Sequence, residues 1–223
     1  MADPPSIEDV KPNPQVITRC TQPNTIAITF DDGPSIYTAT LLDQLQQLQF
    51  HVTFFMNGNN SVDASQPQYQ AILKRIVDEG HQLASHTLTH MDLSTATDAQ
   101  VGQEMHSNEH IIYTATGRIP RYMRPPYGNV TPHTVQLLQG MGYRIVNWSA
   151  DTKDYESNNA DISFGLYQKI VQQGTSGLIV LDHDIVKSSA TQLMPRVVAL
   201  IRQTGWRMVT VAECMGDPLG AYQ

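Results

Sequence analysis

The run TIAITF over residues 25–30, followed by DDGP over residues 31–34, decides the fold class of this chain. Six apolar or β-branched residues predict a buried strand, and Gly33-Pro34 predicts a turn directly after it. A strand that is apolar on both faces is typical of a parallel sheet covered by helices. The two aspartates follow at the carboxyl end of that strand, which is the edge where parallel α/β folds place their active sites.

Strand-like and helix-like segments alternate along the rest of the chain. We expect strands over 25–30, 51–56, 82–85, 121–124, 143–150, 177–181 and 206–211, and helices over 37–48, 69–78, 97–114, 131–141, 162–173 and 189–203. Strands separated by helices predict right-handed parallel crossovers, and therefore an α/β fold with a parallel sheet. A closed barrel and an open, doubly wound sheet both fit this order.

Length and composition favour one globular domain. The chain has 223 residues, 40% of them hydrophobic and 16% charged, which is ordinary for a folded α/β domain. We expect an extended lead-in over 1–18, with four prolines by Pro14, a single domain over 19–215 and a tail over 216–223. The net charge of −7 and the scattered Lys and Arg argue against nucleic acid as a partner. No apolar run approaches the ~20 residues of a membrane span.

The two cysteines bear on the compartment. Cys20 precedes the first predicted strand and Cys214 follows the last. Two free thiols are one interpretation. A bridge that closes a loop of about 195 residues would stabilise the fold by roughly 5 kcal/mol, and it would indicate an oxidising compartment. We favour the bridge. The chain has no hydrophobic leader, so we expect either a cytosolic protein or a mature form without its leader.

Two short motifs predict a metal site. Asp31 and Asp32 supply adjacent carboxylates, and His86 and His90 supply two imidazoles four positions apart, which face the same way if the intervening turn is helical. The aspartates could instead cap the next helix, and a lone histidine is usually structural. A carboxylate and two imidazoles together are the ligand set of a divalent ion with open positions, and such sites activate water.

Polar residues recur at the predicted strand ends, and they belong to five motifs. TFDDGP (29–34), HTLTH (86–90), RPPYG (124–128), DTKDY (151–155) and LDHD (181–184) occur in this order. They resemble the motifs of the polysaccharide deacetylases, the NodB-homology domain of carbohydrate esterase family 4, and most of all those of fungal chitin deacetylases. The resemblance spans residues 25–211. It implies a single-domain distorted (β/α)7 barrel with its active site at the C-terminal strand ends.

The resemblance also implies roles for the motif residues. The metal ligands are Asp32, His86 and His90, for one divalent ion that we expect to be Zn²⁺, with Co²⁺, Ni²⁺ or Fe²⁺ as alternatives. Asp31 matches the general base, which takes a proton from the attacking water. His183 matches the general acid that protonates the departing amine. Asp154 matches the carboxylate that orients His183, and Asp151 is an alternative for that task.

Four further residues match positions around the substrate. Arg124 corresponds to the residue that pairs with the base and keeps it ionised. The backbone N–H of Tyr127 corresponds to a donor for the developing oxyanion. Leu181 would lie under the acetyl methyl group. Tyr155 stands where the family usually has a tryptophan, so an aromatic platform is kept with different bulk and an added hydroxyl.

The expected function is the hydrolysis of acetamido groups of N-acetylglucosamine units in chitin or its oligosaccharides, with release of acetate. The partner is therefore an N-acetylglucosamine polysaccharide or oligosaccharide, and we expect a secreted monomer of the extracellular space or cell wall. The same site could act on peptidoglycan or on acetylxylan. A carbohydrate-binding protein that kept the metal but lost turnover is a different interpretation. A glycosidase is disfavoured, because neighbouring carboxylates cannot straddle a sugar at ~5–9 Å.

Overall fold

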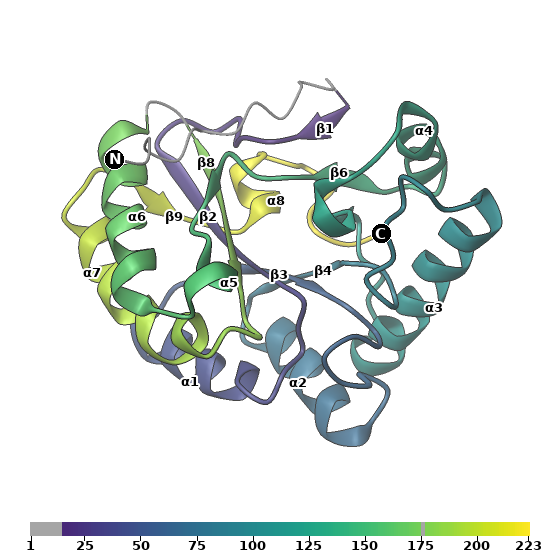
Figure 1. Ribbon diagram of the computed structural model, residues 1–223, viewed down its shortest axis with the longest axis horizontal. Coiled ribbons are helices and arrows are strands. Elements are labelled where there is room, and N and C mark those ends of the chain that lie inside the picture. Colours follow the sequence, from purple (N-terminus) through teal and green to yellow (C-terminus); the bar gives the residue numbers. More distant parts are fainter. Residues whose placement is uncertain (1–14, 175–176) are drawn as a thin grey trace.

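The strands lie side by side in one curved sheet in the computed structural model, which describes residues 15–174 and 177–223 (Figure 1). The strands in spatial order are β1 (Val16–Ile17), β6 (Arg144–Val146), β5 (Tyr122–Met123), β4 (Gln82–Ser85), β3 (Thr53–Met56), β2 (Thr25–Asp31), β8 (Leu178–His183) and β7 (Ala150–Asp151), and β9 (Arg207–Met208) pairs with the start of β2. All of these pairings are parallel. The predicted parallel sheet is therefore confirmed.

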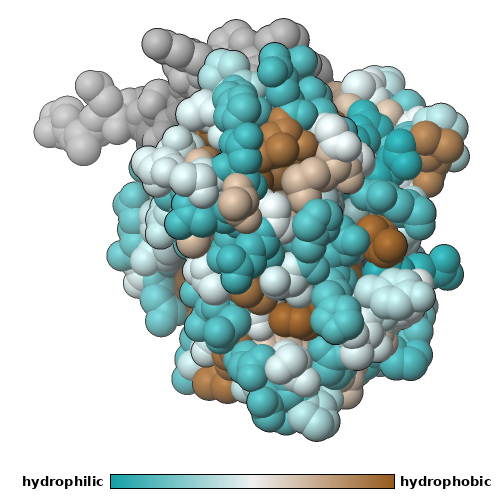
Figure 2. Space-filling model, turned by 90° about the vertical axis from the view of Figure 1, so that its right-hand side faces the viewer, coloured by the Kyte–Doolittle hydropathy of each residue, from teal (hydrophilic) through white to brown (hydrophobic). Residues whose placement is uncertain are grey.

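Helices cover the outer face of the sheet. They are α1 (Thr38–Leu48), α2 (Pro67–Asp78), α3 (Asp98–Thr116), α4 (Pro132–Gly140), α6 (Ala160–Gln173) and α7 (Met194–Arg202), while the one-turn helix α5 (Asp154–Ser157) follows the carboxyl end of β7. Figure 1 shows α6, α7, α1, α2 and α3 following one another around the outside of the curve. Figure 2 shows the side of the molecule where α3 lies, with hydrophilic residues over most of it and hydrophobic residues in small, separate patches.

Strand β2 is the centre of the core, and both of its faces are buried. All seven of its residues are buried, as the apolar run predicts. Ile26, Ile28 and Phe30 pack outwards against the helices, in the same apolar layer as Leu41 of α1. Ala27 points inwards and packs with a second set of apolar residues inside the curve. This double burial holds β2 in place, and the two aspartates are attached to its end.

The expected strand 143–150 is wrong, because the chain changes partners in its middle. Asn147 donates its backbone N–H to Ile17 of β1 at 2.7 Å, whereas Ser149 donates to Ile179 of β8 at 3.0 Å. Residues 147–149 thus connect β6 to β7, which lie near opposite ends of the strand order. This short connection brings the two edges of the sheet towards each other. The sheet therefore curls into a distorted barrel and is not an open, doubly wound sheet.

The C-terminal part also differs from the prediction. The expected strand 206–211 is reduced to β9, and a short helix, α8 (Val211–Cys214), follows it. α8 lies inside the curve (Figure 1), where Val211 donates its N–H to Oγ1 of Thr53 at 2.9 Å and Ala212 donates to Oε1 of Gln82 at 2.8 Å. Because Thr53 and Gln82 begin β3 and β4, α8 closes the N-terminal end of the barrel. The expected helix 189–203 begins with a π-helical segment, η2 (Ser189–Leu193).

Both expected ends of the domain make contacts with the sheet. Residues 1–14 of the predicted lead-in lie outside the described residues, but Val16–Ile17 pairs with β6. In the predicted tail, Gln223 donates its N–H to the carbonyl of Ile119 at 2.9 Å, and Arg121 donates to Ala221 at 2.9 Å. Cys20 and Cys214 form a disulfide between the first and last parts of the fold. Among the described helices, none has the length and apolarity that crossing a membrane requires.

Candidate active site

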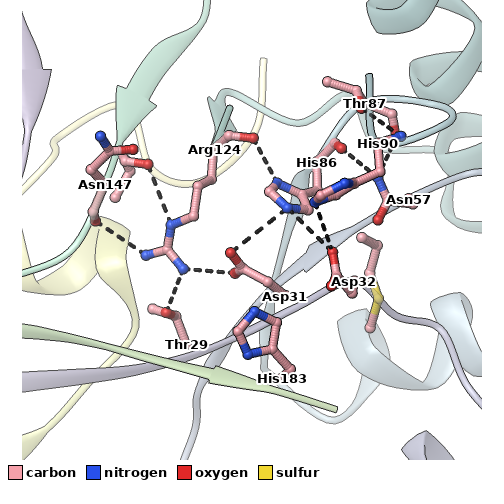
Figure 3. Close-up of polar contacts among 12 residues, drawn as sticks. Thr29, Asp31, Asp32, Asn57, His86, Thr87, His90, Arg124, Asn147 and His183 are labelled. Carbon is pink, nitrogen blue, oxygen red and sulfur yellow. Dashed lines mark hydrogen bonds and ion pairs between the residues drawn. The ribbon is translucent and has the colours of Figure 1, made fainter. Parts of the chain in front are cut away.

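The carboxyl ends of β5, β4, β2 and β8 lie at the same edge of the sheet. They carry polar side chains from four of the sequence motifs, namely Asp31, Asp32, His86, Arg124 and His183. Figure 3 shows Asp31 between Arg124 and His86, with His90 and Asp32 beside His86 and His183 on the opposite side of Asp31. Residues as far apart in the chain as Asp31 and His183 thus form one cluster, because parallel strands all end at the same edge.

The two aspartates reach one site because the strand ends between them. Adjacent residues of a regular strand point to opposite faces, but Asp32 has a φ of 73° and so leaves the strand geometry. Gly33 then passes directly over Asp184. A Cβ atom on Gly33 would lie 2.2 Å from Oδ2 of Asp184. Only glycine therefore fits this turn without displacing Asp184.

Asp32, His86 and His90 form a cluster that fits a divalent ion. One ligand atom from each residue lies within 4.8 Å of the others. Oδ1 of Asp32 lies 3.5 Å from Nε2 of His86 and 3.2 Å from Nε2 of His90. This buried oxygen has no hydrogen-bond partner in the described structure. A buried carboxylate oxygen facing two imidazole nitrogens is a polar environment that a bound cation would complete.

The protonation of these groups suits a metal site. Nδ1 of His86 lies 2.7 Å from the carbonyl oxygen of Arg124, so Nδ1 carries the proton and Nε2 keeps its lone pair for a metal. Burial lowers the pKa of His90, which favours the neutral ligand form. Burial alone would raise the pKa of Asp32, but the electrostatic attraction of the neighbouring imidazoles of His86, His183 and His90 outweighs burial and lowers that pKa to about 2.

The loop between His86 and His90 is not helical, so helical spacing is not what brings the two imidazoles together. Thr87 and His90 both have left-handed backbones, with φ of 70° and 61°. Two residues that sequence reasoning missed hold this loop. Asn57 donates its side-chain amide to the carbonyls of His86 and Thr87, and Glu104 accepts from the backbone N–H of Thr89 at 2.8 Å. Asn57 directly follows β3, so the strand-end rule could have identified it.

Arg124 is fully buried and forms an ion pair with Asp31. Its Nη1 atom lies 2.6 Å from Oδ1 of Asp31 and 2.7 Å from Oγ1 of Thr29. The guanidinium lies over the ring of Phe55 at 4.1 Å and faces the ring of Trp148 at 5.6 Å. This arrangement fixes one oxygen of Asp31. The other oxygen, Oδ2, lies 3.8 Å from Nε2 of His86 and therefore faces the metal-ligand cluster.

Asp154, and not Asp151, contacts His183. Oδ1 of Asp154 lies 2.8 Å from Nδ1 of His183, and its Oδ2 accepts from the backbone N–H of His183 at 2.8 Å. Asp151 instead accepts from the hydroxyl of Tyr155 at 3.0 Å. Because Nδ1 of His183 donates to Asp154, its Nε2 atom remains for the substrate side. The sequence had left this choice open.

The electrostatic surroundings keep His183 protonated at neutral pH. Burial lowers the pKa of this imidazole, but the hydrogen bond to Asp154 and the negative charges of Asp154, Asp31 and Asp32 outweigh burial. Together they raise the pKa of His183 to about 9. A histidine that carries its proton at pH 7 is suited to donate it to a leaving group.

Two exposed tyrosines lie at opposite sides of the cluster. Tyr127 is 64% exposed, and its ring centroid lies 4.6 Å from that of His90. Tyr155 is 52% exposed, and its ring centroid lies 5.2 Å from that of His183. Leu181 is buried two positions before His183 and so lies on the same face of β8. All three residues that the sequence predicts to contact substrate therefore lie next to the polar cluster.

Comparison with known proteins places this arrangement in a family. The family model described as polysaccharide deacetylase matches residues 18–146. A chitin deacetylase of Pestalotiopsis sp is 38% identical over 204 residues, which are 91% of this chain and 67% of that protein. A probable peptidoglycan-N-acetylglucosamine deacetylase of Arthroderma benhamiae is 38% identical over 94% of this chain and 48% of its own length.

The fold agrees with the sequence comparison. The structure of the chitin deacetylase from the fungal pathogen Colletotrichum lindemuthianum superposes with a TM-score of 0.88 at 35% identity, over 93% of this chain and 94% of that chain. The five motifs, the curled parallel sheet and the match of more than half of the chain to the family model agree with one another. This chain belongs to the polysaccharide deacetylase family.

Proposed function

We propose that this protein is a metal-dependent N-deacetylase that hydrolyses the acetamido group of N-acetylglucosamine units in chitin or chito-oligosaccharides and releases acetate. One observation carries the proposal. The Asp32, His86 and His90 cluster lies beside two further pairs at the same edge of the sheet (Figure 3), Asp31 with Arg124 and His183 with Asp154. The similarity to fungal chitin deacetylases supports chitin as the substrate class.

Asp32, His86 and His90 would hold the metal ion, which when bound would polarise the amide carbonyl and activate the attacking water. Asp31 would accept the proton of that water. Its Oδ1 is fixed by Arg124, so Oδ2 is the oxygen available for this task. The backbone N–H of Tyr127 would donate to the carbonyl oxygen as negative charge develops there.

His183 would complete the reaction by donating its Nε2 proton to the departing amine. An amide anion is a very poor leaving group, so cleavage of the C–N bond requires such a donor. Asp154 holds the imidazole by its other nitrogen, which fixes both the ring orientation and the tautomer. Leu181 would line the site under the acetyl methyl, and Tyr127 and Tyr155 would flank the sugar.

Zinc is the metal we propose, because two neutral imidazoles and one carboxylate are typical zinc ligands that leave positions open for substrate and water. The buried disulfide between Cys20 and Cys214 supports secretion, since disulfides persist in oxidising compartments.

Peptidoglycan N-acetylglucosamine is a second candidate substrate. The similarity to the probable peptidoglycan deacetylase of Arthroderma benhamiae favours it. Both substrates carry the same acetamido group, so the residues proposed for the chemical steps would serve either one. The exposed groups around the site, such as Tyr127 and Tyr155, would decide between them.

Acetate release tests the proposal. Purified protein is stripped with a chelator, reloaded with Zn²⁺ or Co²⁺, and assayed on chitin oligomers, peptidoglycan and acetylxylan side by side. We expect acetate from chitin oligomers, its loss on chelation and its return with metal. Asp31→Asn should lower the rate by about 10²–10⁴-fold, which is the usual range for a general base, while Asp161→Asn on the exposed start of α6 should leave it unchanged.

Two results would contradict the proposal. A metal-loaded protein that releases no acetate from any acetylated glycan is not a deacetylase. If such a protein still bound chitin oligomers, and did so equally well after Asp31→Asn, it would be a carbohydrate-binding protein. Faster acetate release from peptidoglycan than from chitin oligomers would make peptidoglycan the preferred substrate. The proposed residue roles would be unchanged.

A further inference from the structure

The carboxyl group of Asp182 lies in an apolar layer, and it has no role in the proposed mechanism. It precedes His183 in β8, but alternation along the strand turns it to the opposite side, away from the candidate active site and towards the helices. Its strand neighbours on that face, Leu178 and Val180, belong to the apolar layer between sheet and helices, as does Tyr167 of α6. Asp182 is fully buried there.

The hydrogen bonds of Asp182 are informative because a hydroxyl has one proton. Oγ1 of Thr152 lies 2.6 Å from Oδ1 of Asp182 and 2.9 Å from the carbonyl oxygen of Leu181. The Thr152 hydroxyl can donate to only one of these oxygens. A carbonyl cannot donate, so each contact is a full two-centre hydrogen bond when Oδ1 of Asp182 carries a proton and donates to Thr152, whereas an ionised Asp182 leaves two acceptors sharing one hydroxyl proton. Tyr167 donates its hydroxyl to the other oxygen, Oδ2.

The surrounding charges favour the same state. Among the described residues, the titratable groups that face Asp182 are Asp154 from α5, Tyr167 from α6 and His183 from its own strand. Burial and then the negative charge of Asp154 raise the pKa of Asp182 well above its ordinary value, and His183 offsets them only in part. Burying an ionised carboxylate without a paired cation is costly, whereas a neutral acid with both oxygens in hydrogen bonds is not.

Thr152 connects this buried acid to the candidate active site. Thr152 is itself buried and lies between Asp151, the end of β7, and Asp154, the first residue of α5. Asp154 is the carboxylate that contacts His183. A displacement of Thr152 would therefore move Asp154 relative to the imidazole.

We propose that Asp182 is a neutral carboxylic acid that acts as a positioning residue, because its hydrogen bond to Thr152 fixes the segment 151–155 and so holds Asp154 against Nδ1 of His183. The neutral state of Asp182 also affects His183. Asp154 is then the negatively charged carboxylate next to Nδ1 of His183. A second buried negative charge close to Asp154 would change the pKa of His183. The catalytic part of this inference rests on the proposed function, but the protonation state does not.

Infrared difference spectroscopy tests the protonation state without any assay. The carbonyl band of a protonated carboxylic acid should be present in the wild type and absent from Asp182→Asn, at a pH above the pKa of Asp184, which burial raises to about 7. Asp161→Asn, which changes an exposed carboxylate at the start of α6, is the matched control and should keep the band. A band of unchanged intensity in Asp182→Asn would show that Asp182 contributes no protonated carboxyl group, and it would overturn the proposal.

Two substitutions test positioning. Asp182→Asn should retain kcat, KM and the alkaline limb of the pH profile, because the amide can donate to Thr152 and accept from Tyr167. Asp182→Leu keeps an apolar residue in an apolar layer but loses both bonds, and it should lower kcat by about tenfold with little change in KM. Thr152→Val should have the same effect, and the double variant Asp182→Leu/Thr152→Val should lose no more than either single variant.

A structural readout separates failure of the proposal from failure of the proposed function. In NMR titrations, Asp182→Leu should lower the pKa of His183, since Asp154 is no longer held against it, while Asp182→Asn should leave that pKa unchanged. This holds even if the wild type releases no acetate. Wild-type kcat and an unchanged His183 titration in Asp182→Leu would overturn the positioning role. A lower His183 pKa in Asp182→Asn would show that Asp182 carries a charge.

Discussion

At the scale of single residues, Asp31, His183 and His86 each have one polar atom held by a neighbouring group and a second polar atom left free. Arg124 occupies one oxygen of Asp31, Asp154 occupies one nitrogen of His183, and the carbonyl of Arg124 occupies one nitrogen of His86. The remaining atoms all face the same region. Because each group is restrained from behind, little reorganisation is needed when a substrate binds, and such preorganisation is the usual source of electrostatic catalysis.

The titration of His183 is the first prediction at this scale. NMR titration of the metal-free protein should give His183 a pKa of about 9, above the ordinary value of 6.5. Since the folded-state pKa is the higher one, the charged imidazole stabilises the fold fully below pH 6.5, and this contribution disappears as the pH rises through about 9. Metal binding should lower the pKa, because a cation repels the imidazolium. A pKa below 6.5 in the metal-free protein would contradict the geometry.

Replacement of Asp154 is the second prediction. Asp154→Asn removes the negative charge that opposes burial, so the pKa of His183 should fall and the alkaline limb of the rate profile should move to lower pH. We expect kcat to fall by about 10- to 100-fold, as part of the general-acid contribution is lost. Steady-state rates across pH measure both effects. The exposed Asp161→Asn is the control, and an unshifted alkaline limb in Asp154→Asn would show that another group is the acid.

At the scale of elements, short connections decide where the strand ends point. The turn after β2 is held to the end of β8. Ser35 donates its hydroxyl to the carbonyl of Asp184 at 2.9 Å, and Thr38 donates to Oδ2 of the same residue at 2.5 Å. Asp184 in turn packs against Gly33. The two segments that carry Asp31 and His183 are therefore fixed to each other directly after the strands end.

Substitution of Gly33 tests this contact. In Gly33→Ala the added methyl would lie 2.2 Å from Oδ2 of Asp184, so one of the two segments must move. We expect a loss of about 1–3 kcal/mol of unfolding free energy, the usual cost of overpacking, together with a lower kcat. Denaturant unfolding and acetate release measure the two effects.

Gly165→Ala is the matched control for this variant. Gly165 lies within α6, where an added Cβ meets no atom within 4 Å, so alanine should stabilise the protein by about 0.5–1 kcal/mol. Removing the carboxyl group in the double variant Gly33→Ala/Asp184→Ala should recover part of the loss. If Gly33→Ala is as stable as the wild type, the predicted clash between the added methyl group and Asp184 is wrong.

At the scale of the whole molecule, the N- and C-terminal parts of the described chain close the barrel together. α8 occupies its N-terminal end, and the disulfide joins α8 to the segment before β2 across 194 positions of sequence. This closure lies at the opposite end of the strands from the active-site cluster. The contacts that close the barrel and the residues of the candidate active site thus lie at opposite ends of the same strands, as is usual in parallel barrels.

Removal of the disulfide should therefore affect stability far more than activity. The double variant Cys20→Ser/Cys214→Ser should lose up to about 5 kcal/mol of unfolding free energy, because a long loop is no longer closed in the unfolded chain. At low temperature its kcat and KM should stay close to the wild type. Thermal melting and steady-state kinetics measure the two quantities. A variant that keeps its melting temperature but loses its activity would show that the bridge acts on the site.

Much of the fold could be read from local pattern. The strands over 25–30 and 82–85, the helices α1, α2 and α3 and the clustering of motifs at strand ends all follow from side-chain periodicity and from the geometry of parallel sheets. The pattern failed at 143–150 because a strand-like run does not show that its two halves pair with different strands. It failed at α8 because a helix of four residues has too few turns to show a period.

The sequence by itself determined the family, the ligand types and the edge of the sheet where they meet, since these depend on residue identity and on strand direction. Only the tertiary structure decided that Asp154 and not Asp151 reaches His183, that left-handed residues and Asn57 shape the loop between His86 and His90, and that Asp182 lies buried next to Thr152. Each of these outcomes depends on contacts between segments far apart in the chain, and such contacts leave no periodic signal in the residues that make them.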